Sequence, residues 1–246
     1  MGNGPDAGGV LRRQHLQHRA AAARGLRSVF GRHPGGTVRI ALDEEARAIQ
    51  EALERSRFRD RFELVTRWAT QPDDLLRELV NLQPTVVHFS GHGGGDAGGE
   101  HRTGPRREFV AEPATAGGRE QGLVFHHGEG RAQLVSSDAL AKAFSAAGAS
   151  VRLVLLNACH SEDHVEVLRA HVDCVIGMSG SIHDVAARRY ASSFYTGLDA
   201  RQSVAAAHAQ GCAAISLAGL PDADLPRLCV RAGVSAERLV LAEGCP

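Results

Sequence analysis

Apolar residues recur along the chain with two periods, one typical of helices and one typical of buried strands. Leu42, Ala46, Ile49 and Leu53 lie three or four residues apart, which predicts an amphipathic helix. Three acidic residues in its first turn, the last of them Glu45, suit the dipole of this helix. The same reasoning predicts further helices near residues 70–80, 136–144, 161–170, 184–198 and 203–217, and strands over residues 62–68, 84–90, 123–125, 132–135, 151–156 and 174–178.

The helix near residues 70–80 has a recognisable start. A polar cap precedes Pro72, which is well tolerated in a first helical turn. We expect four apolar residues to form its buried face: Leu75, Leu76, Leu79 and Val80.

The alternation of strands with helices predicts an α/β fold. Long helices separate the strands, and the central strands are apolar throughout, as in a mainly parallel sheet with helices on both faces. We expect this domain to span residues 37–218, with a surface loop over residues 96–121, which are almost without apolar content. Residues 1–36 are basic and predicted to be a disordered tail, and residues 219–246 form a weakly patterned C-terminal extension.

The composition excludes several classes of protein. Of the 246 residues, 43% are hydrophobic and 23% are charged, which excludes wholesale disorder. Lys plus Arg equals Asp plus Glu at 28 each, so the basic excess of a dedicated nucleic-acid or membrane-surface protein is missing. The sequence contains no apolar run of about 18 residues, the length that a membrane-spanning helix requires. No signal peptide is recognisable, so we expect a cytoplasmic protein.

The five cysteines fit a reducing environment. Their number is odd and no two are spaced as Cys-x-x-Cys, so a disulfide framework is not expected. Buried cysteines usually behave as small hydrophobic residues, and we expect this of Cys174, Cys212 and Cys229.

Two predicted strands end in residues suited to catalysis. The strand over residues 84–90 leads to His92, and the strand over residues 151–156 leads to Cys159, just before a predicted helix. Ligands of a parallel sheet bind beyond the carboxyl ends of its strands. A cysteine is nucleophilic as its thiolate, and its pKa falls beside an imidazolium or at a helix N-terminus. This pattern predicts a Cys159 nucleophile with His92 as its base, and an oxyanion held by the amides of Gly93 and Cys159.

The residues at these strand ends resemble a known family. The segments HFSGHG (residues 88–93) and NACHS (residues 157–161) each follow an apolar strand, and together they resemble the caspase-like cysteine peptidases, most closely the CHAT family. The similarity extends over roughly residues 38–217. It implies a caspase-like three-layer sandwich that cleaves peptide bonds, with His92 as general base and Cys159 as nucleophile.

The resemblance also implies partners and a specificity. Family members often act under a sensor module, and several act in bacterial defence. No repeat-built sensor is present here, so we expect a regulatory partner protein besides the protein substrate, and no cofactor or metal. In the metacaspase branch of the fold, an aspartate two residues before the nucleophile receives a basic substrate side chain. That position is Asn157 here, and Asp184 follows the next strand. We expect both to bind substrate, although Asn157 is neutral, and we expect a basic residue before the scissile bond.

Other interpretations of the same residues stay open. The family pattern begins with an apolar strand that residues 1–36 do not offer, so the chain could be a catalytically weak domain that serves as a protein-binding module. Cys159 could instead be a redox switch. A zinc site could join it to His164, His171 and Cys174, although this spacing matches no common template. His88 lies inside its strand and is expected to be a hydrogen-bonded core residue.

Overall fold

The computed structural model describes residues 42–55, 62–68, 70–91, 93–94, 122–127 and 131–241. Its elements follow in chain order as α2 (Leu42–Glu54), α3 (Pro72–Leu82), β1 (Val86–Ser90), β2 (Gly93–Gly94), β3 (Gly122–His127), β4 (Arg131–Ser136), α4 (Ser137–Ala146), η3 (Gly148–Ser150), β5 (Leu153–Asn157), α5 (Glu162–Leu168), β6 (Cys174–Met178), α6 (Asp184–Asp199), α7 (Val204–Leu217), η4 (Pro221–Asp224) and β7 (Pro226–Val230). Every helix predicted from the sequence is present.

Four of the described strands form the central sheet, in the order β1-β5-β6-β7. Strands β1, β5 and β6 are parallel, and β7 runs antiparallel beside β6. The register of the first pair places Ser90 opposite Asn157, so β1 and β5 end at the same level. The mainly parallel α/β fold predicted from the sequence is confirmed.

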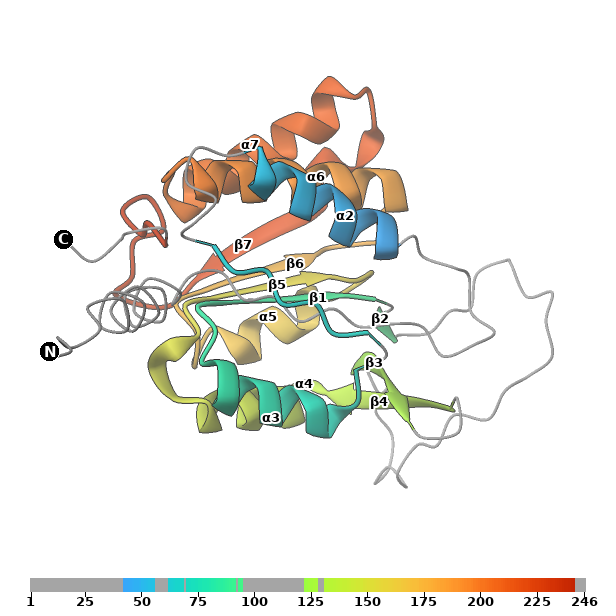
Figure 1. Ribbon diagram of the computed structural model, residues 1–246, viewed down its shortest axis with the longest axis vertical. Helices are drawn as coiled ribbons and strands as arrows, with labels where there is room; N and C mark the ends of the chain where they lie inside the picture. Colours follow the sequence, from blue (N-terminus) through green and yellow to red (C-terminus); the bar gives the residue numbers. More distant parts are fainter. Residues whose placement is uncertain are drawn as a thin grey trace, which may run out of the picture.

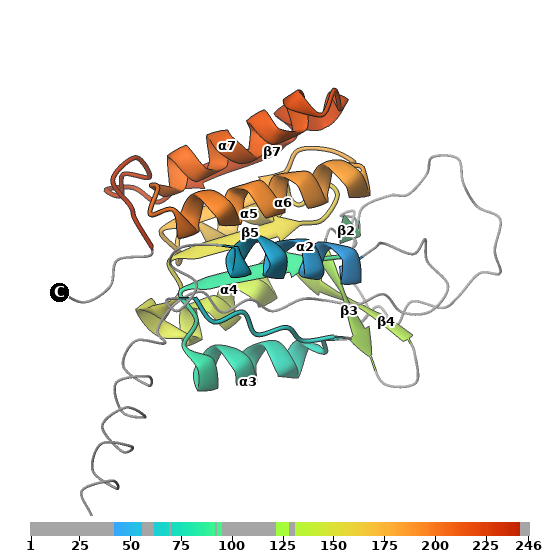
Figure 2. The same cartoon turned by 45° about the horizontal axis from the view of Figure 1, so that its top comes forward.

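Helices cover both faces of this sheet. Figures 1 and 2 show α2, α6 and α7 on one face and α3, α4 and α5 on the other. The side chains of β5 alternate between the two resulting cores. Leu153 and Leu155 pack beneath α2, α6 and α7, whereas Val154 and Leu156 pack beneath α3, α4 and α5. This two-sided burial explains why β5 is apolar along nearly its whole length.

A small antiparallel sheet of β2, β3 and β4 lies beside the end of β1 (Figure 1). It confirms the predicted hairpin, in which β3 pairs with β4. Gly122 is required for this pairing, because an added Cβ would lie 2.5 Å from a side-chain atom of Leu134 and 2.7 Å from the Val135 carbonyl oxygen. The short strand β2 pairs with β3 through Gly93 opposite Leu123.

The buried face of α3 is narrower than predicted. Leu75 and Leu79 are buried, but Leu76 is 44% exposed and Val80 is 64% exposed, so the prediction for these two was wrong. Glu78 shares the buried face with Leu75 and Leu79, and its carboxylate lies 3.0 Å from the Arg67 guanidinium. The buried stripe is therefore centred between Leu75 and Leu79, which turns the other two apolar side chains outward.

Two further segments differ from the sequence prediction. Residues 62–68 form no strand and pair with none of the described strands, although Phe62 and Leu64 pack against the core beneath α2. Conversely, β7 lies within the predicted C-terminal extension and adds an edge strand to the central sheet. After the buried Pro226, its apolar residues are only partly buried, which explains its weak pattern.

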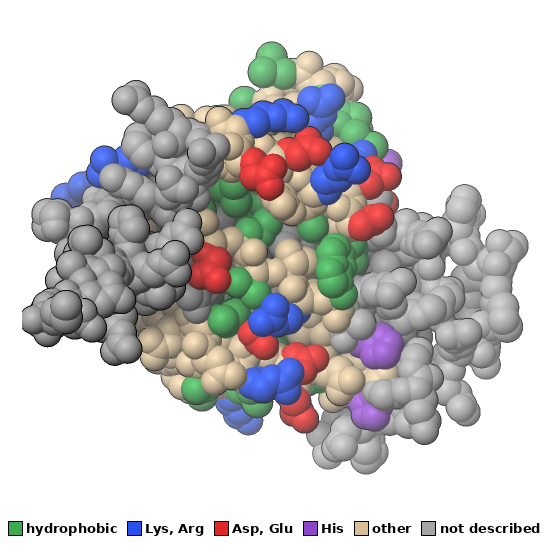
Figure 3. Space-filling view, viewed as in Figure 1, with side chains coloured by type: hydrophobic (Ala, Val, Ile, Leu, Met, Phe, Trp, Pro, Cys, Tyr) green, Lys and Arg blue, Asp and Glu red, His purple; other side chains and the backbone are tan. Residues whose placement is uncertain are grey.

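The surface over α2 and α3 carries both signs of charge. Figure 3 shows acidic and basic side chains interspersed on this face. Arg47 pairs with Glu51 on α2, and Arg77 pairs with Asp74 on α3. The described residues of this face form no continuous basic patch of the kind that binds nucleic acid.

The predicted tail (residues 1–36) and the predicted loop (residues 96–121) lie outside the described residues, as does Cys245. None of the helices in the described ranges combines the length and apolar character that crossing a bilayer requires.

Candidate active site

The predicted nucleophile lies in a sharp turn at the carboxyl end of β5. Ala158 is buried, Cys159 is partly exposed, and α5 begins three residues later at Glu162. His160 adopts a left-handed backbone conformation with φ of 52°, so the chain turns abruptly after Cys159. The structure therefore brings this thiol out of the sheet, close to the start of a helix.

The loop after β6 supports this turn. The amide of His160 donates to the Gly180 carbonyl at 3.2 Å, and its Nε2 lies 3.1 Å from Ser181 Oγ. Behind them, the buried Ser161 hydroxyl donates to the Leu156 carbonyl and accepts from the Met178 amide, both at 2.9 Å. Ser161 thus links β5 to β6 directly behind Cys159. This role was not predicted, because it depends on a strand seventeen residues away.

The predicted base, His92, lies outside the described residues, but the chain on both sides of it is described. The Gly91 amide donates to the Asn157 carbonyl at 3.3 Å, which extends the contact between β1 and β5 one residue beyond β1. Gly93 follows in β2. The segments carrying His92 and Cys159 therefore leave neighbouring strands at the same edge of the sheet.

Asp184, a predicted substrate-binding residue, is exposed at the first position of α6. The preceding residue, His183, is held by Asp222, whose carboxylate accepts from the His183 amide at 2.9 Å and lies 2.8 Å from Nδ1. Asp222 comes from η4, so the C-terminal segment fixes the start of α6. This pair was not predicted, since residues from Gly219 onward carry little pattern.

Asn157 occupies a different environment from the one predicted. Its side chain is only 4% exposed, and Nδ2 donates to Glu45 Oε1 at 2.6 Å and to the Ala187 carbonyl at 3.4 Å. These contacts turn the amide toward α2 and α6, beneath the end of β5. The substrate contact expected of Asn157 stays a prediction, which its burial does not favour.

Glu45 is the centre of the buried polar contacts beneath the strand ends. It is 2% exposed and accepts from the Ser90 hydroxyl as well as from Asn157. Its Oε1 lies 3.4 Å from Nε2 of His88. Burial raises the pKa of Glu45 to about 7 and lowers the pKa of His88 to about 3. His88 is fully buried and stacks on Tyr195, which confirms the prediction of a core histidine.

The other described cysteines lie in or pack against the two hydrophobic cores. Burial raises the pKa of Cys174 to about 12, and it also raises the pKa values of Cys212 and Cys229. His164, drawn into the zinc alternative, instead places Nδ1 2.6 Å from Ser137 Oγ. Among the described residues, no three His, Cys, Asp or Glu side chains gather to hold a metal ion.

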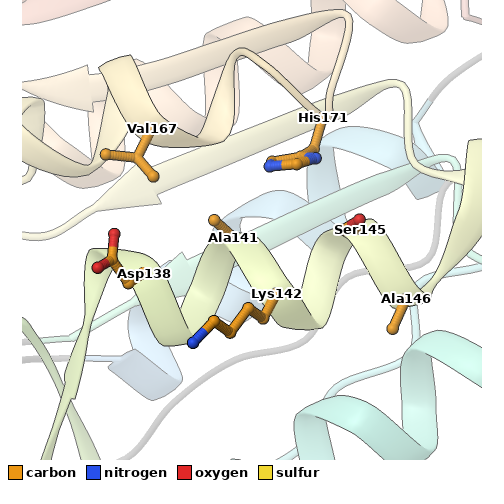
Figure 4. Close-up of a pocket in the computed structure, with 7 residues that line it drawn as sticks. All are labelled: Asp138, Ala141, Lys142, Ser145, Ala146, Val167 and His171. Carbon is orange, nitrogen blue, oxygen red and sulfur yellow. The ribbon is translucent and has the colours of Figure 1, made fainter.

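One surface pocket lies between α4 and α5, away from these strand ends. Figure 4 shows Val167 of α5 and His171, in the turn after α5, facing Ala141 of α4 across it. Neither Cys159 nor Asp184 lines this pocket. It therefore contributes nothing to the candidate active site.

Comparison with known proteins agrees with this fold. A profile of the CHAT domain matches residues 39–216, whereas no curated protein sequence matches significantly. The fold is similar to that of a secreted C11 cysteine protease from Bacteroides thetaiotaomicron, whose X-ray structure holds an irreversible peptide inhibitor. The TM-score is 0.54 at 15% identity, and the match covers 84% of this chain and 66% of that protein. Since the CHAT profile matches well over half of its length, the chain belongs to the CHAT domain family.

Proposed function

We propose that the chain is a cysteine endopeptidase with Cys159 as nucleophile and His92 as general base. One observation carries the proposal: Cys159 is a partly exposed thiol at the carboxyl end of β5, beside the strand that leads into His92. The buried Cys174 provides a contrast, because a thiol with a pKa of about 12 is almost entirely protonated at neutral pH.

The proposed reaction follows from these positions. His92 takes the Cys159 proton, and the thiolate attacks the carbonyl carbon of the scissile peptide bond. The amides of Gly93 and Cys159 donate hydrogen bonds to the resulting oxyanion. The bond to nitrogen then breaks, and the imidazolium of His92 gives its proton to the leaving amine. Water, deprotonated by His92, hydrolyses the thioester and returns the free thiol.

We assign Asp184 the recognition of a basic residue before the scissile bond. It is exposed, it begins α6 directly after the loop that supports the Cys159 turn, and its carboxylate supplies negative charge there. A cationic side chain is therefore favoured over a neutral one at this position. The neutral and buried Asn157 does not contribute to this preference.

The proposed peptidase activity is also regulated. We propose control by a separate partner protein and a role in bacterial defence, on the strength of membership in the CHAT family. The test is to compare cleavage by the purified chain with cleavage after a candidate partner is added. A partner that changes neither the rate nor the occupancy of Cys159 by a covalent inhibitor is not a regulator.

An irreversible peptidyl ketone with Arg before its electrophile tests the catalytic proposal. It should modify Cys159 and no other cysteine, and peptide cleavage should fall at least about 10³-fold in Cys159→Ala and in His92→Ala. His171→Ala is the matched control, because this histidine follows the C-terminal end of α5, the end away from Cys159, and lines the pocket of Figure 4. Cleavage that survives in Cys159→Ala would contradict the proposal. A cellular effect that survives in the same variant would favour the protein-binding module.

A further inference from the structure

Four polar side chains meet beneath the candidate active site, and we name them the Glu45 cluster: Glu45, His88, Ser90 and Asn157. Glu45 comes from α2, whereas its partners come from the last residues of β1 and β5. The carboxylate accepts from Ser90 Oγ through one oxygen and from Asn157 Nδ2, at 2.6 Å, through the other. A single buried side chain thus bridges two parallel strands.

The position of these hydrogen bonds along the chain makes them relevant to the site. Ser90 lies two residues before His92, and Asn157 lies two residues before Cys159. The two also face each other in the register of β1 and β5. Any movement of one strand end relative to the other must therefore stretch or break a hydrogen bond to Glu45.

Stability alone does not account for a carboxylate in this place. Burying a charge costs free energy, and well-packed apolar residues often replace buried ionic groups without loss of stability. Ala46, Ile49 and Leu53 on the same helix face are apolar and fill the adjoining core, and Leu42 is also buried on this face. Glu45 interrupts this apolar stripe at the point where α2 crosses the ends of β1 and β5.

We propose that Glu45 is a positioning residue, which fixes the distance between the segments that carry His92 and Cys159 by bridging Ser90 and Asn157. This inference rests on the proposed Cys159–His92 dyad and adds the residue that aligns it. A base and a nucleophile react efficiently only when they are held within hydrogen-bond reach, and small displacements reduce rates strongly.

The test uses the rate of Cys159 alkylation by iodoacetamide as a function of pH, followed by mass spectrometry, together with thermal unfolding of each variant. Glu45→Leu removes both hydrogen bonds, Ser90→Ala removes one, and Glu45→Gln can keep both because the Ser90 hydroxyl can donate or accept. Asp43→Asn is the matched control, an exposed acid two residues earlier on α2.

We expect the alkylation rate of Cys159 near pH 7 to fall about tenfold or more in Glu45→Leu and to fall by a smaller factor in Ser90→Ala. In Glu45→Gln and in Asp43→Asn, the alkylation rate of Cys159 should stay within about twofold of the wild-type rate. Should Glu45→Leu fail to fold, Ser90→Ala, which removes a single oxygen atom, carries the test alone.

Two results would overturn the inference. One is an unchanged pH dependence of the Cys159 alkylation rate in folded Glu45→Leu or Ser90→Ala. The other is a fall in the Cys159 alkylation rate of Glu45→Gln that is as large as the fall in Glu45→Leu. Failure of the dyad itself looks different: Cys159 of the wild type would then titrate like an ordinary thiol, and His92→Ala would leave its profile unchanged.

Discussion

The two faces of the central sheet differ in chemistry where the strands end. Beneath α3, α4 and α5, the side chains of β1 and β5 are apolar: Val87, Phe89, Val154 and Leu156. Beneath α2, α6 and α7, the same strands begin with apolar residues and finish with Ser90 and Asn157, both bonded to Glu45. On the first face β1 and β5 present only apolar side chains, whereas on the second they carry a polar anchor under the candidate active site.

The two kinds of face contribute free energy differently. Burying a large aliphatic side chain contributes about 1.5–3 kcal/mol, so an apolar face is a source of stability. A buried hydrogen bond adds only about 1 kcal/mol net, but it is directional. Substitutions on the apolar face should therefore change unfolding, and substitutions in the Glu45 cluster should change the reactivity of Cys159.

Leu168→Ala gives the largest expected effect on stability. Leu168 is fully buried at the end of α5, on the apolar face and at the far end of this helix from Cys159. The cavity should lower the free energy of unfolding by about 2–5 kcal/mol, measured by urea denaturation. Leu217→Ala, at an exposed position, should change it little. If Leu168→Ala slowed Cys159 alkylation as much as Ser90→Ala does, the proposed difference between the two faces would be contradicted.

Glu45→Gln should change the pH dependence of stability. The folded-state pKa of Glu45, about 7, lies above its ordinary value of 4.5, so between these values the folded chain binds more protons than the unfolded chain. Stability contributed by Glu45 therefore falls as pH rises through this window, by about 3 kcal/mol in total. Burial of His88 acts in the opposite direction, because its lowered pKa makes stability fall as pH drops below about 6.5.

In urea denaturation, the stability of Glu45→Gln relative to wild type should thus rise from pH 4.5 to pH 7, while the contribution of His88 stays in place. Asp43→Asn, on the exposed side of α2, should show no such change. A difference between Glu45→Gln and wild type that is the same at pH 5 and pH 8 would show that Glu45 does not titrate in this range.

Asp184→Asn gives the smallest effect, confined to specificity. Removing the carboxylate should lower the preference for Arg over Gln before the scissile bond by about tenfold, because a charge-assisted hydrogen bond is lost. The rate with a Gln substrate should stay unchanged. Asp138→Asn, an exposed acid on α4, is the control. An equal loss for both substrates would instead indicate that Asp184 supports the structure of the loop.

The sequence predicts those parts of the fold that depend on local pattern. The helix α2 follows from its apolar spacing, and β5 follows from its continuous apolar run. The edge strand β7 is not predictable in this way, because most of its side chains are not fully buried and its pairing with β6 spans distant residues. Residues 62–68 show the converse: an alternating pattern packs Phe62 and Leu64 against the core without strand pairing.

The same distinction between local pattern and long-range contact applies to the candidate site. Cys159 is predictable because a reactive residue after a buried strand is a local signal. The burial of Asn157 is not, because its partner Glu45 lies 112 residues earlier. A signal for Glu45 does exist in the sequence: it occupies a position on the apolar face of α2, three residues after Leu42 and one before Ala46. Its acidic neighbours conceal that signal, since all three suit the helix dipole equally well.

The most direct test of the account is the pH dependence of Cys159 alkylation in the wild type and in His92→Ala, followed for each cysteine by mass spectrometry. Cys229, whose pKa burial raises, serves as an internal reference. We predict that Cys159 of the wild type reacts well below the ordinary thiol midpoint of about 8.5, and that His92→Ala returns it to that value. A Cys159 that titrates near 8.5 in both proteins would contradict the proposed dyad.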